Sequence, residues 1–315
     1  MKKKILKTIV LSILPLFLLI GCTKTENKEN ASFSSENKMT VVTTTAMIGD
    51  VASEIGKERV EVYSMMGPGV DPHLYKAKTS DLERLTSSDL IIYNGIHLEA
   101  KMADVLEKLS STKNIHSIEE GLDENNLITI EQAHDPHIWF DVQNWITASK
   151  IIRDALTSTD PDGKEIYQAN YESYIAKLEE LDSYVKSQAQ KVPKEQRILI
   201  TAHDAFNYFG RAYDFEVKGL QGISTVDEAG TLDVRNLAQF ITDNKIKALF
   251  VESSVSPKSI QALQAAVESR GWNIIIGGEL YSDAMGDANT FEGTYIGMVT
   301  HNIDTIVSGL LGEEE

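Results

Sequence analysis

The chain has 315 residues, of which 47 are Asp or Glu and 30 are Lys or Arg, and its formal net charge at pH 7 is −17. Such an acidic protein is a poor candidate for binding nucleic acid or anionic lipid through its charge. Its single cysteine excludes an internal framework of disulfide bonds.

The first 21 residues have the pattern of a secretory signal peptide. Lysines near the start precede an apolar run from 9 to 20, which is shorter than the roughly 20 residues that a membrane-spanning helix needs. The run ends in Gly21-Cys22, which resembles a bacterial lipobox, in which cleavage leaves Cys22 as a lipid-modified N-terminus. The alternative is a stray cysteine at the end of a signal sequence. Without the four lysines of residues 1–21, 26 basic residues remain against 47 acidic ones, a net charge of −21.

Residues 22–38 are polar and predict a flexible tether, because they cannot bury enough apolar surface to fold. The folded part that follows is long enough for two lobes of ordinary size. Short apolar runs alternate with helical patterns, which predicts an α/β fold with two parallel-sheet (β/α) lobes, at 39–160 and 194–315. We expect strands at 40–45, 60–66, 89–94, 114–118, 198–202, 216–220, 246–252 and 273–277, and helices at 80–88, 100–109, 233–244 and 259–270.

The longest helical pattern lies between the two predicted lobes, within 161–193. It runs from 164 to 192 without Gly or Pro, and one face repeats large apolar side chains at spacings of three and four. Gly163 precedes the pattern and Pro193 ends it. We expect one long, stiff linking helix, and the alternative is a surface helix packed on a single lobe.

Three histidines and one aspartate each follow a predicted strand. They are His73, His137, His203 and Asp283, two in each predicted lobe. The carboxyl ends of strands face the ligand crevice in open α/β sheets, so two facing lobes would bring these side chains together. Three imidazoles and one carboxylate are a suitable shell for Zn²⁺, Mn²⁺ or Fe²⁺. For a single histidine such as His137, the alternative is a buried imidazole satisfied by one hydrogen bond. Spacing alone is weak evidence, because ligands tens of residues apart carry no local signature.

Six segments carry a more specific signal. They are MGPGVDPHLYKA at 66–77, DPHIWF at 135–140, TAHDAF at 201–206, KGLQGIST at 218–225, FVESSVS at 250–256 and GELYSDAMG at 278–286. Through them the chain resembles the TroA/PsaA class of metal-binding lipoproteins, the extracytoplasmic receptors of manganese and zinc ABC importers. Within that class it is especially similar to the manganese-binding lipoproteins of Gram-positive bacteria.

The resemblance implies two lobes bridged by a long rigid helix, with one metal ion held between them. It implies His73, His137, His203 and Asp283 as the metal ligands. It also implies a monomer that is lipid-anchored on the outer face of the cytoplasmic membrane and delivers its ion to an ABC permease. No Gly-x-x-x-x-Gly-Lys-[Ser/Thr] phosphate loop is present, so the ATPase would be a separate subunit.

Two features of the sequence point to different metals. Several manganese-specific relatives have a glutamate where His203 stands, and a third imidazole favours zinc, whereas a carboxylate suits manganese. Dedicated zinc receptors often carry a histidine-rich loop, whereas residues 119–133 are acidic and contain no histidine. The resemblance favours manganese, with zinc or iron as the alternative. Because the imidazoles must be neutral to bind, we expect metal affinity to fall as the pH drops through about 6.5.

The other histidines are weaker candidates. His97 follows a predicted strand near the crevice, His134 belongs to the acidic loop, and His116 and His301 fit structural roles. Glu252, at the end of a predicted strand, is favoured to accept a hydrogen bond from a ligand imidazole, and Asp135, Asp141 and Asp204 compete for that role. Trp139 and Phe140 could exclude water from the site or form plain core between the lobes.

The sequence therefore predicts a non-catalytic metal receptor. A metallohydrolase is one alternative, although a shell supplied wholly by protein leaves little room for a catalytic water. A surface adhesin is the second alternative, a label that this family has sometimes carried, although no adhesive repeat is evident.

Overall fold

The computed structural model describes residues 33–130 and 132–312. The predicted signal peptide, Cys22 and most of the predicted tether lie outside the described residues. No helix within the described ranges combines the length and the apolar character that crossing a membrane requires.

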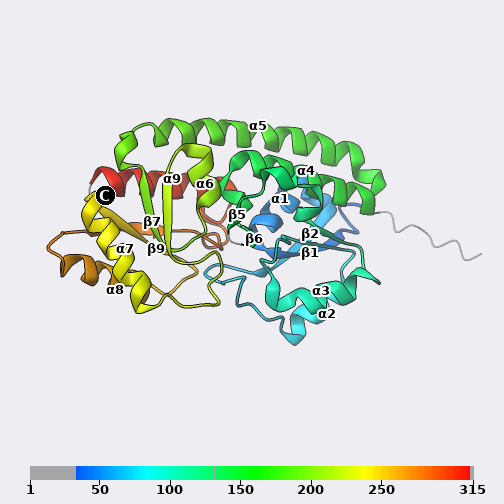
Figure 1. Ribbon diagram of the computed structural model, residues 1–315. Coiled ribbons are helices and arrows are strands. Elements are labelled where there is room, and N and C mark those ends of the chain that lie inside the picture. The colour runs from blue at the N-terminus through cyan, green and yellow to red at the C-terminus, as the bar shows by residue number, and fades with distance from the viewer. Residues whose placement is uncertain (1–32, 131, 313–315) are drawn as a thin grey trace, which may run out of the picture. The chain divides into compact units, whose positions relative to one another are not determined.

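The first half of the described chain builds a four-stranded parallel sheet with the strand order β2-β1-β3-β4 (Figure 1). Its strands are β1 (Met39–Thr45), β2 (Val60–Met66), β3 (Leu90–Tyr93) and β4 (Ile115–Ser117). They confirm the four strands predicted here. β1 is buried along almost its whole length, as expected of a central strand with neighbours on both sides. The helices are α1 (Ala46–Gly56), α2 (Thr79–Ser87) and α3 (Ala103–Ser110).

A short antiparallel pair, β5 (Thr129–Ile130) and β6 (Ala133–His134), follows this sheet. The chain then forms a single 3₁₀ turn at Ile138–Phe140 and enters α4 (Val142–Thr159). Asp141 caps α4, because its carboxylate accepts a hydrogen bond from the backbone N–H of Gln143 at 3.0 Å.

The long helix α5 covers Lys164–Ala189. At 1.5 Å per residue it is about 39 Å long, and it ends three residues before the predicted end at Val192. Its apolar face is buried as predicted, with Tyr171 only partly so. The helix packs on α1 and α4 of the first half and on α9 of the second half, so it is not a surface helix of one lobe.

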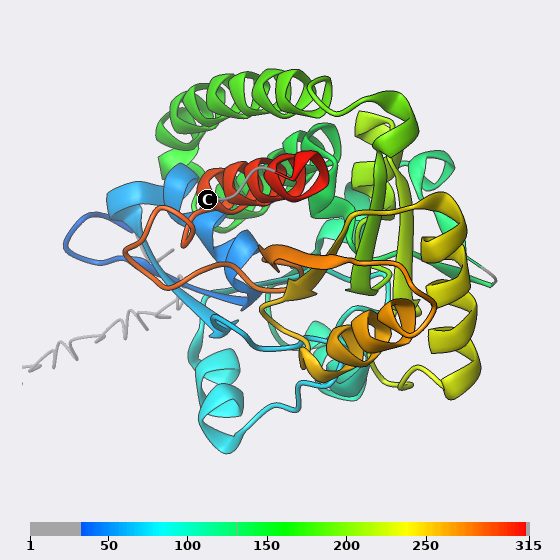
Figure 2. The same ribbon diagram turned by 90° about the vertical axis from the view of Figure 1, so that its left-hand side faces the viewer.

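The second half contains two parallel strand pairs (Figure 2). β7 (Ile198–His203) pairs with β8 (Glu216–Gln221), and β9 (Ala248–Glu252) pairs with β10 (Ile275–Leu280), while β7 contacts β9. The helices are α6 (Asn207–Tyr213), α7 (Thr231–Asn244), α8 (Lys258–Glu268) and α9 (Tyr295–Leu311). The fold is therefore α/β with parallel-sheet lobes and a long linking helix, as the sequence predicted.

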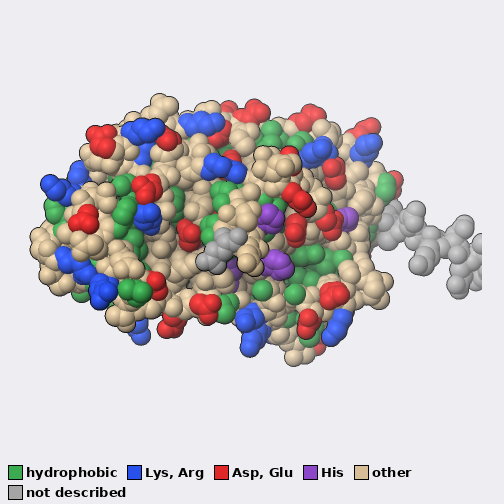
Figure 3. Space-filling model, in the orientation of Figure 1, with side chains coloured by type: hydrophobic (Ala, Val, Ile, Leu, Met, Phe, Trp, Pro, Cys, Tyr) green, Lys and Arg blue, Asp and Glu red, His purple; other side chains and the backbone are tan. Residues whose placement is uncertain are grey.

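The largest hydrophobic cluster extends through both halves. It includes Ile48 and Trp145 from the first half, Leu178 from α5, and Phe209 and Ile306 from the second half. A smaller cluster lies within each half. On the surface drawn in Figure 3, acidic and basic side chains are interspersed, which is typical of solvated charge.

Candidate metal centre

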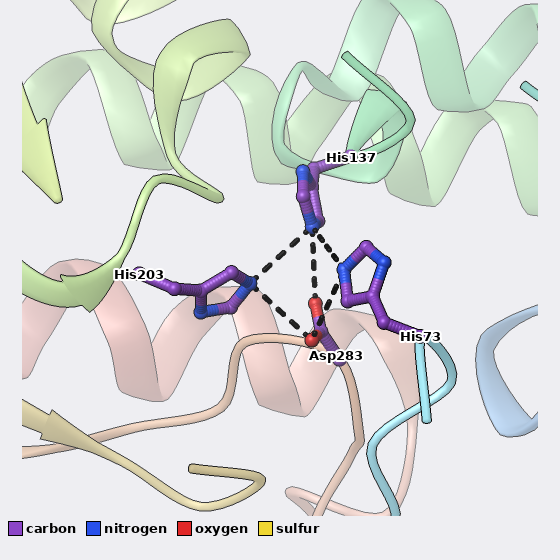
Figure 4. A group of neighbouring side chains, drawn as sticks. All are labelled: His73, His137, His203 and Asp283. Carbon is purple, nitrogen blue, oxygen red and sulfur yellow. Dashed lines mark hydrogen bonds and ion pairs between the residues drawn. The ribbon is translucent and has the colours of Figure 1, made fainter. Parts of the chain in front are cut away.

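The four predicted ligands come from four different segments and converge on one point (Figure 4). His73 lies in the segment that follows β2, and His137 directly precedes the 3₁₀ turn before α4. His203 is the last residue of β7, and Asp283 lies three residues after β10. One ligand atom from each lies within 4.8 Å of the others, and all four side chains are buried.

The three imidazoles present their Nε2 atoms to one another and to the carboxylate. Nε2 of His137 lies 3.2 Å from Nε2 of His73 and 3.3 Å from Nε2 of His203. Oδ1 of Asp283 is 3.4 Å from Nε2 of His137, and Oδ2 is 3.3 Å from Nε2 of His203 and 3.8 Å from Nε2 of His73. Ligands at 2.0–2.1 Å from a tetrahedral ion are separated by about 3.3 Å, so the spacing fits a single small cation.

The carboxylate of Asp283 has the environment expected of a metal ligand. It is buried, and neither oxygen has a hydrogen-bond partner among the residues that the structure describes. A buried carboxylate without donors is costly unless a cation compensates its charge. Because its two oxygens face different imidazoles, it could bind an ion through one oxygen or both.

Two carboxylates orient the imidazoles, which settles the choice that the sequence left open. Oδ1 of Asp135 lies 2.7 Å from Nδ1 of His137, and Oε2 of Glu252 lies 2.5 Å from Nδ1 of His203. Each contact leaves Nε2 directed at the common point and makes the imidazole a stronger donor to a metal. Asp141 instead caps α4, and Oδ1 of Asp204 is buried without a hydrogen-bond partner among the described residues.

Aromatic side chains close one side of the site. The ring centroids of His137 and Trp139 are 5.3 Å apart, and Trp139 is 1% exposed. The indole Nε1 of Trp139 donates to the backbone carbonyl of Ser282 at 3.0 Å, next to Asp283. Phe140 stacks on Phe206 at 4.2 Å between centroids. These residues exclude water and also join the two halves, so both predicted roles apply.

The surroundings shift the pKa of each site residue. Burial lowers the pKa of His73 to about 4. Burial also opposes the charge on His137 and His203, but Asp135 and Asp283 raise the pKa of His137 to about 9. Glu252 and Asp283 likewise raise the pKa of His203 well above its ordinary value. The burial of Asp283 is outweighed by His203 and His137, which hold its pKa well below the usual range.

The remaining histidines lie outside this cluster, which is the one group of at least three clustered His, Cys, Asp or Glu side chains found in the described ranges. His97 is exposed. His134 contacts Thr129, His116 contacts Asn114, and His301 contacts the carbonyl of Glu279.

Three polar side chains near the site were not predicted from the sequence. Asn207 and Tyr208 of α6 hold Asp135 from the second half, through its carboxylate at 3.0 Å and its backbone carbonyl at 2.9 Å. Thr225 makes a similar contact with Asp71. The sequence does contain a signal for the two aspartates that these side chains contact, because Asp71 and Asp135 both begin an Asp-Pro-His tripeptide.

Comparison with known proteins finds metal-binding proteins that are similar along most of the chain. Residues 41–309 match the family model ZnuA, described as zinc-uptake complex component A, periplasmic. The "Zinc-binding protein TroA" of Treponema pallidum is 47% identical over 95% of this chain and 96% of its own length. The "Manganese-binding lipoprotein MntA" of Bacillus subtilis is 44% identical over 93% of this chain and 95% of its own length.

The solved structures include a close match to the fold. The periplasmic zinc-binding protein TroA of Treponema pallidum superposes with a TM-score of 0.86 at 49% identity, covering 87% of this chain and 99% of that chain. The sequence matches, the fold match and the buried cluster of three histidines and one aspartate all indicate the same family. The chain belongs to the ZnuA/TroA family of metal-binding receptors of ABC transporters.

Proposed function

We propose that this protein captures one divalent transition metal ion outside the cytoplasmic membrane and delivers it to an ABC importer. His73 and His137 from one lobe and His203 and Asp283 from the other would bind the ion. The observation that carries the proposal is the buried carboxylate of Asp283, which faces three Nε2 atoms at 3.3–3.8 Å and makes no hydrogen bond with the described residues.

The proposed lobes are residues 39–160 and 194–315, with the linking segment at 161–193. The parallel strands of each half and the packing of α5 on both halves support this division. We further propose residues 1–21 as signal peptide and 22–38 as tether, with a lipid on Cys22 that anchors a monomer to the outer face of the membrane. The name of the Bacillus subtilis relative includes the word lipoprotein, which supports the anchor.

The cargo is manganese or zinc. Three imidazoles favour zinc over manganese in affinity, and the near-tetrahedral spacing of the ligand atoms suits zinc. Manganese is named for one relative and zinc for another, at 44% and 47% identity, so similarity alone does not choose between them. We expect zinc to displace manganese in vitro whichever ion the cell supplies.

Metal analysis of protein purified without chelators tests the proposal. We expect close to one equivalent of zinc or manganese, and its loss in His137→Ala and Asp283→Ala. A matched control is His301→Ala, a histidine outside the cluster, which should retain the ion. Full metal content in Asp283→Ala, or an ion located elsewhere in a crystal, would refute the proposed site.

The proposed role is transport, with the ATPase on a separate subunit, and it requires no catalysis. An enzymatic role would need an open coordination position for water, and here four side chains surround the point. Hydrolysis of ester or phosphate substrates by metal-loaded protein, lost in His137→Ala, would instead support a metallohydrolase. Binding to a host ligand that persists after all four residues become Ala would support an adhesin.

A further inference from the structure

A hydrogen bond between the two halves lies beside His73, outside the metal shell. The hydroxyl of Thr225 donates to Oδ2 of Asp71 at 2.5 Å. The other oxygen of Asp71 accepts from the backbone N–H of His73 at 2.8 Å and from that of Leu74 at 3.4 Å. One carboxylate thus joins the backbone of a proposed ligand to the opposite half of the chain.

The same arrangement occurs at His137. Oδ1 of Asp135 accepts from the backbone N–H of His137 at 2.9 Å, and Oδ2 accepts from Asn207 of the second half at 3.0 Å. Both Asp-Pro-His tripeptides therefore use one oxygen for the histidine backbone and the other for a side chain from across the molecule. The repetition indicates that the cross-half contact positions the histidine and is not incidental.

The two histidines differ in what else holds them. His137 directly precedes the 3₁₀ turn that leads into α4, and Tyr208 also binds the carbonyl of Asp135. His73 lies in a segment, 67–78, that contains neither helix nor strand, and its neighbour Leu74 is 48% exposed. In Figure 4 this segment reaches the site separately from the chain that carries His137.

Thr225 is placed for this contact by an otherwise accessible loop. It is 7% exposed, and it is the one buried residue of the segment 222–230, every residue of which the structure describes. Its neighbour Val226 is 46% exposed. A loop that buries one hydroxyl against a carboxylate of the opposite half restrains the segment that holds His73.

We infer that Thr225 is a positioning residue that holds His73 in the metal shell through Asp71 and thereby slows release of the bound ion. This inference rests on the proposed function. When the hydrogen bond between Thr225 and Asp71 breaks, segment 67–78 loses this hydrogen bond to the second half, and His73 leaves the ion before the other three ligands do.

Release kinetics of Thr225→Val test the inference, with Thr225→Ser as the matched control that keeps the hydroxyl. Zinc-loaded protein is mixed with excess chelator, and the release of zinc is followed over time. We expect release to be about tenfold faster in Thr225→Val, as is typical for losing a hydrogen bond to a charged group. Thr225→Ser should stay within about twofold of the wild type. The metal-free protein should melt only a few degrees lower in Thr225→Val than in the wild type, because a single hydrogen bond is lost.

A second variant tests whether Thr225 acts through Asp71. Asp71→Asn should also speed release, and adding Thr225→Val to it should have little further effect, because both remove one interaction. Release at the wild-type rate in Thr225→Val, equal effects of Val and Ser, or additive effects in the double variant would overturn the inference.

Hydrogen exchange of the metal-free protein gives a readout that needs no metal. The backbone amides of His73 and Leu74 should exchange faster in Thr225→Val than in Thr225→Ser, and unchanged exchange would overturn the positioning role. Failure of the proposed function would appear differently, as wild-type protein that binds neither zinc nor manganese.

Discussion

At the scale of single residues, His137 depends most on its neighbour Asp135, because that carboxylate contacts both its backbone N–H and its Nδ1. We predict that Asp135→Asn lowers zinc affinity by about 10–100-fold, since an amide is a weaker acceptor and leaves the imidazole less basic. Chelator competition would measure the affinity.

Asp141→Asn is the control for this prediction. Asp141 lies close by in sequence but caps α4, and an asparagine keeps that cap. Its zinc affinity should match that of the wild type. Equal losses in Asp135→Asn and Asp141→Asn would contradict the role assigned to Asp135.

The pH dependence of binding follows from the histidines. His137, with a pKa of about 9, carries a proton at neutral pH, and His203 has a raised pKa as well. Metal must displace these protons, so apparent affinity falls as the pH drops below about 9, by up to tenfold per unit for each proton released. His73, with a pKa of about 4, adds no loss until the pH is strongly acidic.

The pH at which apparent affinity begins to fall is thus well above the value of about 6.5 that is expected for histidines with an ordinary pKa. Calorimetry at pH 7 in buffers of different ionisation enthalpy would count the released protons, and we expect between one and two. Affinity that stays constant from pH 9 to pH 7 would refute this assignment of the protons.

Much of the site was predictable residue by residue, and the reasons are chemical. His203 ends β7, and His73 and Asp283 follow β2 and β10, so three of the four side chains lie beyond the carboxyl ends of parallel strands, which face the ligand crevice. His137 instead follows the antiparallel strand β6. The partners of the imidazoles were only partly predictable: Glu252 and Asp135 were both candidates, but the sequence did not assign Glu252 to His203, from which it lies 49 residues away. Only the folded chain decides which of several carboxylates reaches Nδ1.

At the scale of elements, α5 connects the halves through one apolar face. Leu178 is fully buried on that face, whereas Glu179 is exposed. We predict that Leu178→Ala lowers the free energy of unfolding by about 2–5 kcal/mol, through lost burial and the cavity left behind. Urea denaturation of the metal-free protein would measure it.

The neighbouring Glu179→Ala is the control, with an expected change within about 0.5 kcal/mol. A similar loss in both variants would mean that α5 is held by general helix stability and not by packing of its buried face.

Element boundaries were less predictable than element identity. α8 covers Lys258–Glu268, so it begins one residue before and ends two residues before the predicted helix at 259–270. β10 extends to Leu280, three residues beyond the prediction. Burial and pairing with β9 set that end, and neither leaves a signal in the local sequence.

At the scale of the whole molecule, buried contacts join the two halves along the side covered by α5. The hydroxyl of Tyr295 donates to the carbonyl of Trp139 at 2.7 Å, and the indole of Trp139 donates to Ser282 at 3.0 Å. The largest apolar cluster extends through both halves. A wide opening would break these hydrogen bonds and expose packed side chains, which is costly.

We therefore predict that metal-free and metal-loaded protein differ by a rotation between the lobes of no more than about 10°, with larger displacements confined to segments such as 67–78. Crystal structures of both forms, superposed on the first sheet, would measure the rotation. Small-angle scattering would show whether the radius of gyration in solution stays constant when zinc is removed. A rotation of tens of degrees would contradict the prediction, because the apolar cluster beneath α5 could not remain packed through such a movement.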